Sequence, residues 1–274
     1  MSAAQNPNNR VAGPLRSLAR HRELITQLTH REIIGKYRGS FLGLLWSLLN
    51  PLLLLVVYTF VFTQVFKARW VEGESTAQFA IALFVGLIIH GFLAECISRA
   101  PLLVTANPSY VTKVVFPLEI LPFPSVFAAL FHAGVSTVVL LVAQLVISGH
   151  LPWTAVLFPM ILLPLAAQIL ALSWILSGIS VYVRDIAQFV TILVTGLLFL
   201  SPVFFPLHSL PVYLQGVARF NPLTIPIEES RKVLLWGQWP DFGLLGIYSV
   251  VSLVVFVIGF AVFQKVRRGF ADVL

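Results

Sequence analysis

Long apolar stretches separated by short polar connections dominate the sequence from residue 41 onward. A helix that crosses the hydrocarbon core of a bilayer needs about 20 mostly apolar residues. Six stretches meet this requirement: 41–66, 77–97, 122–147, 155–181, 187–206 and 243–263. The pattern therefore predicts an all-α membrane protein with six transmembrane helices within residues 39–274. An even number of spans places both termini on the same side.

The N-terminal region has a different pattern. Residues 1–14 are polar, which predicts a disordered end. Over residues 15–38, Leu18, Ile25 and Leu28 recur at helical spacing between basic residues. This pattern predicts an amphipathic helix in the headgroup region of the membrane. The helix is either a surface anchor or a lever that a cytoplasmic partner pushes.

The spacing of glycines at the start of the first apolar stretch is consistent with two structures. Gly35, Gly39 and Gly43 follow one another at intervals of four. If this segment is helical, the three glycines line one face and permit a close helix–helix seam. If it is not, they form a hinge before the first span. Pro51, inside that span, is expected to kink it.

Composition supports a membrane protein. Of 274 residues, 58% are hydrophobic and 11% are charged, and the mean hydropathy is +0.91. Soluble domains are about a quarter charged, so a soluble enzyme is excluded, as is intrinsic disorder of the whole chain. The single cysteine, Cys96, excludes an intrachain disulfide and a multi-cysteine metal site.

The distribution of charge predicts the orientation. The net charge is +7, and basic residues cluster on the side of the two termini. Thirteen of the 18 lie there: Arg10, Arg16, Arg20, Arg22, Arg31, Lys36, Arg38, Arg99, Lys113, Arg184, Lys265, Arg267 and Arg268. The opposite side carries equal numbers of basic and acidic residues. The positive-inside rule therefore places both termini in the cytoplasm.

Two connections between predicted spans have sequences that indicate a role beyond linking the spans. The segment at about 98–121 is interrupted by prolines and lightly charged, so it either docks into a cytoplasmic protein or rests on the bilayer. The segment at about 207–236 is too apolar for a solvated loop and too short for a domain. It predicts two short helices that dip back into the outer leaflet, either as an outer gate or as interfacial helices.

Motifs for catalysis or nucleotide binding are absent. The sequence has no G-x-x-x-x-G-K-[ST], H-E-x-x-H or G-x-S-x-G, and its six histidines lack metal-ligand spacing. The spans hold almost no ionisable residues, which disfavours an ion-coupled carrier. The energy source is therefore expected on another protein. Aromatic residues are abundant instead, and they either pack in the core or line a path for sugars.

Several blocks, in order along most of the chain, resemble bacterial polysaccharide-exporting ABC permeases of the type-2 ABC transporter permease family. They are 31–38 (REIIGKYR), 42–46 (LGLLW), 50–52 (NPL), 107–122, 183–186 (VRDI), 201–203 (SPV), 220–223 (FNPL) and 229–231 (ESR). Glu32 stands where the family usually has Asp, and Lys36 where Arg is common. Pro226 is expected to interrupt the helix that leads to Glu228 and Glu229.

The resemblance implies a non-enzymatic subunit of the bacterial inner membrane. Two copies would enclose a channel above two copies of an ATP-binding-cassette ATPase. ATP and Mg²⁺ would be used by that ATPase, and this chain would bind no cofactor or nucleic acid. A lipid-linked glycan, with O-antigen as the first expectation, would move outward among membrane lipids.

The resemblance also implies roles for individual residues. Coupling to the ATPase would involve Asn107, Tyr110, Lys113, Phe116, Glu119, Arg31 and Glu32. The channel lining would include Trp46, Tyr58, Phe62, Phe66, Phe189 and Phe199. The outer gate would include Phe204, Phe205, Tyr213, Phe220, Glu228, Glu229 and Arg231.

Three alternatives remain. A permease of the same architecture could move drugs or lipids, and it would need a lateral opening rather than a continuous aromatic path. A membrane glycosyl- or acyltransferase would need acidic or histidine residues clustered at one membrane face. An ion-coupled carrier would need ionisable residues at mid-membrane.

Overall fold

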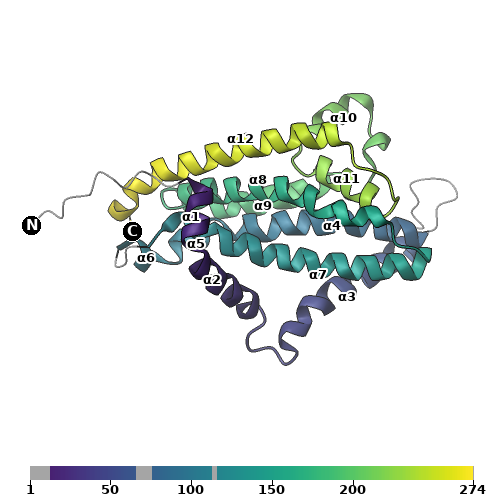
Figure 1. The fold of residues 1–274 in the computed structure, drawn as a ribbon, viewed down its shortest axis with the longest axis horizontal. Coiled ribbons are helices and arrows are strands. Elements are labelled where there is room, and N and C mark those ends of the chain that lie inside the picture. Colours follow the sequence, from purple (N-terminus) through teal and green to yellow (C-terminus); the bar gives the residue numbers. More distant parts are fainter. Residues whose placement is uncertain (1–12, 66–75, 113–115, 274) are drawn as a thin grey trace, which may run out of the picture.

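The chain folds into an elongated helical bundle. The computed structural model describes residues 13–65, 76–112 and 116–273, and these residues contain helices and no strands. Five of the main helices lie roughly along the long axis (Figure 1): α4 (Thr76–Arg99), α7 (Pro122–Ser148), α8 (Phe158–Ile179), α9 (Ile186–Leu200) and α12 (Phe242–Val266). Helix α3 (Trp46–Phe60) runs obliquely to them. The first and last described elements lie at one end of the bundle, which we call the terminal end.

Five helical stretches in the described residues are long and apolar enough to cross a membrane. They are Gly43–Phe60, Ala77–Arg99, Leu118–Ser148, Trp153–Ile179 and Phe242–Asp272. They coincide with five of the six predicted spans. Helix α9 is apolar but has 15 residues, about 22 Å of helix against a hydrocarbon core of about 30 Å.

Helix α9 is shorter than the stretch 187–206 predicted for it. It ends at Leu200, and Ser201 is already extended, with φ −90° and ψ 155°. Pro202 follows directly, and a proline disfavours the helical conformation of the residue before it. The sequence stays apolar up to Pro206, but the helix ends before Pro202. The sixth span therefore stays a prediction.

The N-terminal region forms two helices rather than one. Helix α1 (Pro14–Arg20) and helix α2 (Arg22–Gly35) meet at His21, where φ is −111° and ψ is 23°. The loop after α2 then turns sharply into the 3₁₀ segment η1 (Gly43–Leu45) and α3 (Figure 1). Gly39 (φ 86°) and Gly43 (φ 51°) adopt left-handed conformations. Gly35, Gly39 and Gly43 therefore do not line one face of a helix, and the geometry favours a hinge before the first span.

Helices α8 and α12 pack closely together. A Cβ atom on Gly259 would lie 2.7 Å from Ala171 Cα, so only glycine permits this approach. Trp174, fully buried on α8, packs with ring centroids 5.2 Å from Phe256 and 5.1 Å from Phe260 on α12. This helix pair forms the rigid side of the bundle.

Short elements occupy both polar connections. The predicted segment 98–121 contains α5 (Leu102–Thr105), α6 (Pro108–Thr112) and η3 (Leu118–Ile120). The segment 207–236 contains η5 (Leu207–Ser209), α10 (Val212–Arg219) and α11 (Thr224–Leu234). The remaining elements are the π-helix η2 (Val61–Val65), η4 (Trp153–Leu157) and η6 (Arg267–Asp272).

Pro226 does not interrupt the helix that leads to Glu228 and Glu229, contrary to the expectation. It is the third residue of α11. The N–H groups of a first helical turn have no acceptor within the helix, so a proline there removes no hydrogen bond.

The Gly259 contact predicts a position-specific loss of stability. Gly259→Ala should lower the stability of the purified chain by about 1–3 kcal/mol, because the added methyl group pushes α12 away from α8. The measurement is the thermal denaturation midpoint in detergent. Gly246→Ala is the matched control on the same helix, since nothing lies within 4 Å of its added Cβ. Equal midpoints for the two variants would contradict the packing account.

Candidate functional site

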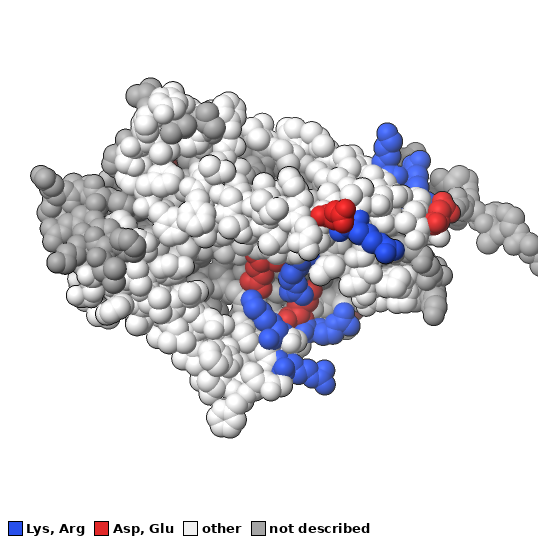
Figure 2. Space-filling model, turned by 180° about the vertical axis from the view of Figure 1, so that it is seen from behind, with Lys and Arg blue, Asp and Glu red and all other residues white. Residues whose placement is uncertain are grey.

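Charged side chains gather in a hollow on one face of the molecule (Figure 2). The hollow has a volume of about 710 Å³, and it is lined by Arg31 and Glu32 of α2, by Lys36 and by Glu95 and Arg99 of α4. Further charged side chains lie between the hollow and the end of the molecule at the right of this view, and the described surface on its other side is uncharged (Figure 2). Glu95 and Arg99 lie in the last two turns of α4, so the hollow opens in the terminal half of the bundle.

The charges in the hollow are paired across elements. Lys36 Nζ lies 2.8 Å from Glu95 Oε1, and His132 Nδ1 of α7 lies 2.9 Å from the same oxygen. Arg99 Nη2 lies 3.3 Å from Glu32 Oε1. These pairs fix α2 and the hinge loop against α4 and α7.

Glu32 is the less well satisfied carboxylate. Burial raises its pKa, while the charge of Arg99 acts in the opposite direction. Its Oε2 atom is buried and has no hydrogen-bond partner among the described residues. Glu32 therefore has one unused acceptor next to the hollow.

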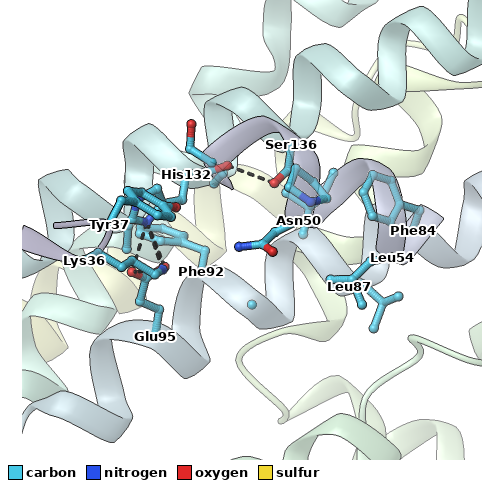
Figure 3. Close-up of a pocket in the computed structure, with 16 residues that line it drawn as sticks. Lys36, Tyr37, Asn50, Leu54, Phe84, Leu87, Phe92, Glu95, His132 and Ser136 are labelled. Atoms are coloured by element: carbon cyan, nitrogen blue, oxygen red, sulfur yellow. Dashed lines mark hydrogen bonds and ion pairs between the residues drawn. The ribbon is translucent and has the colours of Figure 1, made fainter. Parts of the chain in front are cut away.

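A smaller cavity adjoins the hollow (Figure 3) and shares Lys36 and Glu95 with it. Its volume is about 190 Å³, and it lies between α3, α4 and α7. Asn50 of α3 points into the space between the charged group and the apolar wall formed by Leu54 and Leu87 (Figure 3). Polar side chains of the hinge loop, α3, α4 and α7 therefore line this one cavity.

Glu119 connects three elements at the terminal end. Ser17 Oγ donates to its Oε1 at 3.2 Å, and Arg267 Nη1 lies 2.6 Å from its Oε2. Trp174 Nε1 donates to its backbone carbonyl at 2.9 Å. This predicted coupling residue therefore holds α1 and η6 against α8.

The other predicted coupling residues form two groups. Arg31 and Glu32 line the hollow, as described. In the segment 98–121, the rings of Tyr110 and Phe116 are stacked with centroids 4.4 Å apart, and Asn107 Nδ2 donates to Leu103 O at 3.2 Å. Lys113 lies outside the described residues.

Predicted channel and gate aromatics come together in one cluster. Phe62 packs against Tyr58 at 6.3 Å, against Phe204 at 6.4 Å and against Phe79, which was not predicted, at 5.4 Å. Phe199 of α9 stacks on Phe204 at 5.7 Å. The cluster joins α3 and η2 to α4 and α9 near the end opposite the termini.

Three further aromatic predictions lie elsewhere. Trp46 is half-buried at the start of α3, and Phe189, near the start of α9, is 60% exposed. Phe66 lies outside the described residues.

Arg231 anchors α11 at the opposite end. Its side chain is fully buried, and Nε donates to Ala82 O of α4 at 3.0 Å. Nη2 donates to Val203 O at 2.9 Å, and Nη1 lies 3.0 Å from Glu228 Oε1. Burial lowers the pKa of Arg231 to about 10, opposed by Glu228, so the guanidinium stays charged at neutral pH.

The predicted gate residues therefore fall into two groups. Glu229, like Arg231, is buried and paired: Lys232 Nζ lies 2.7 Å from its Oε1, and Asp241 N donates to its Oε2 at 2.8 Å. Tyr213 and Phe220, by contrast, are 75% and 92% exposed. Phe205 is half-buried.

Sequence reasoning did not find the cluster of Lys36, Glu95 and His132 as a site. These residues are separated by 59 and 37 positions, and each alone resembles an interfacial residue. Only the packing of α4 against α7 and the hinge loop brings them together. Among the described residues, no group of His, Cys, Asp and Glu could hold a metal ion.

The fold and these clusters define a multi-pass helical membrane protein whose polar side chains link its helices. Residues 23–235 match the ABC-2 type transporter model, and the chain belongs to that family. It is 30% identical over 263 residues to the O-antigen export system permease protein RfbA of Myxococcus xanthus, covering 94% of this chain and 98% of the relative. The resemblance inferred from the sequence blocks is thereby confirmed.

Two further relatives extend the comparison. The O-antigen export system permease protein RfbA of Klebsiella pneumoniae is 24% identical over 254 residues, or 92% of this chain and 95% of the relative. The capsule polysaccharide export inner-membrane protein CtrC of Neisseria meningitidis serogroup A is 23% identical over 261 residues, or 93% and 95%. These relatives are permeases, so the chain is a transport component and not an enzyme.

The geometry of Arg231 predicts that lysine cannot replace it. Arg231→Met should destabilise the chain by about 3–5 kcal/mol, because it leaves Glu228 without its ion-pair partner and two carbonyls without the guanidinium donor. Arg231→Lys should remain well below wild type, since one ammonium cannot reach all three acceptors. Thermal denaturation of the purified protein measures both. Arg184→Met, at an exposed position, is the control; wild-type stability of Arg231→Lys would contradict the anchor.

Proposed function

We propose that the chain is the membrane subunit of an ATP-driven exporter of a lipid-linked polysaccharide in the bacterial inner membrane. The supporting observation is the near full-length similarity to permeases named for O-antigen and capsule polysaccharide export. O-antigen is the first candidate glycan, because two relatives named for it are more similar to this chain, at 24–30% identity, than CtrC is, at 23%.

In this proposal the chain crosses the membrane six times, with α9 as the fifth span. Helices α1 and α2 form an amphipathic element at the cytoplasmic headgroups, and α10 and α11 are re-entrant on the outer side. The excess of basic residues near the terminal end supports a cytoplasmic location of both termini.

Two copies of the chain enclose the path. The support is the unequal burial of the spans: 17% of the apolar window of α3 is buried within one chain, against 78% for α4. Helix α9 buries only Val190 and Val194, and it exposes apolar side chains elsewhere. A second copy covers these faces, and the aromatic side chains predicted for the channel offer a weakly binding surface on which a polymer can slide.

Two copies of a separate ATP-binding-cassette ATPase, which binds ATP and Mg²⁺, drive the cycle. The segment 98–121 and helix α2 transmit its movement. The stacked pair Tyr110 and Phe116 packs this segment against the core and stiffens it, and Glu119 links it to α1 and η6. The fixed contacts of Arg231 make α11 the static part of the outer gate, and α10 with Tyr213 the movable part.

The test is ATP-dependent transport in proteoliposomes that contain the chain and its cognate ATPase. Lipid-linked O-antigen should become protected inside vesicles in which the ATPase faces outward. Trp46→Ala and Tyr58→Ala should slow transport several-fold without affecting assembly, because the path loses aromatic surface. Trp239→Ala, at an exposed aromatic outside the proposed channel, is the control. Unchanged transport in both channel variants would show that these aromatics only pack.

A further inference from the structure

The 190 Å³ cavity between α3, α4 and α7 contains more polar groups than the fold uses (Figure 3). Its wall includes Leu54, Leu87 and Ile88, as expected within a membrane span. Its other lining residues include a tyrosine, serines, an asparagine, a histidine and the Lys36–Glu95 pair. Polar groups without hydrogen-bond partners are costly next to apolar side chains, so such a concentration needs an explanation.

Four of these groups have hydrogen-bonding capacity to spare. Tyr37 and Ser47 are each only 8% exposed, and their hydroxyl groups have no partner among the described residues. His132 Nε2 is buried and also has none. Asn50 is exposed at the mouth of the cavity, and its amide points into it without a marked interaction (Figure 3). Ser136, by contrast, already donates to His132 O at 2.9 Å.

The set of free groups matches a neutral polyol better than an anion. Lys36 is already neutralised by Glu95 at 2.8 Å, so the cavity offers no unpaired positive charge to a phosphate. Hydroxyl, amide and imidazole groups together supply both donors and acceptors. Sugar hydroxyls need both, because each of them donates one hydrogen bond and accepts others.

The cavity also has room for one sugar unit. Its volume is about 190 Å³, and a single water molecule needs only about 10–15 Å³ of such space, so the cavity holds many water molecules or a ring of similar bulk. Its apolar wall can cover the C–H face of a ring, and its polar side can hydrogen-bond the ring's edge. The charged hollow, which shares Lys36 and Glu95 with the cavity, connects it to the surface of the terminal half.

We propose that this cavity binds one hexose unit of the transported glycan through Tyr37, Ser47, Asn50 and His132. This proposal rests on the proposed function, and it adds a site in which a sugar is recognised before it slides through the channel. Recognition by neutral hydrogen bonds gives weak binding, which a polymer that must move on requires.

The test is saturation-transfer NMR on the full transporter complex in lipid nanodiscs. The probes are the methyl glycosides of D-glucose, D-mannose, D-galactose and L-rhamnose, with inorganic pyrophosphate as the anionic competitor. At least one glycoside should bind, and Asn50→Leu should weaken that binding at least tenfold, because it removes a donor and an acceptor. Ser47→Ala should give a smaller loss in the same direction.

The control is Ser249→Ala on α12, whose hydroxyl group donates to its own helix at Leu245 O, 2.7 Å away. It should bind glycoside as the wild type does. Binding of no glycoside, equal binding in Asn50→Leu, or displacement of the glycoside by pyrophosphate would each overturn the proposal.

Transport measured in the same preparations separates the two proposals. If the wild-type complex transports lipid-linked glycan but binds no glycoside, the sugar site is refuted and the exporter function stands. If the wild type transports no glycan, the proposed function itself fails. If Asn50→Leu keeps its thermal stability, loses glycoside binding and slows transport several-fold, both proposals are supported.

Discussion

A charge buried in an apolar helical bundle must be paired within the protein, and this constraint determines how the chain is held together. Buried or partly buried charges are paired at the terminal end by Glu119, in the terminal half by Glu95 with Lys36 and His132, and at the opposite end by Arg231. Each joins elements that are distant in sequence. Because hydrophobic contacts between helices are not favoured over contacts with lipid, these polar links specify which helices are neighbours.

The molecule has a closely packed part and a part with uncovered apolar faces. Helices α8 and α12 meet at Gly259 and Trp174 as closely as side chains permit, and α11 is anchored on α4 by Arg231. Helices α3 and α9 leave apolar faces uncovered. A transporter needs both: a rigid frame that transmits force, and surfaces that can separate around a substrate.

The sequence carries enough information to predict the helical class, five of the spans and the family. The spans can be predicted because hydropathy over about 20 residues is a local property of the sequence. The family can be predicted because its sequence blocks occur in the same order along this chain. Predictions from local sequence fail, however, where the position of a proline in the backbone decides the outcome. Pro202 shortens the predicted fifth span, and Pro226 fits into a first turn that it was expected to break.

The sites depend on long-range packing, which the sequence pattern does not encode. Lys36, Glu95 and His132 each look like ordinary interfacial residues, and only the meeting of the hinge loop with α4 and α7 makes them a cluster. Glu119 was expected to face a partner, but its side chain also contacts Ser17 and Arg267. The break between α1 and α2 at His21 likewise could not be predicted, because the helical spacing of apolar residues continues across it.

The central claim is that this chain works as the membrane half of an ATP-driven exporter. The most direct measurement is mild extraction of the tagged chain from its native membrane, followed by quantitative mass spectrometry of the bound proteins. The account predicts an ATP-binding-cassette ATPase in one-to-one ratio with the chain. A purified chain with no ATPase, in a detergent that preserves other transporter complexes, would contradict it.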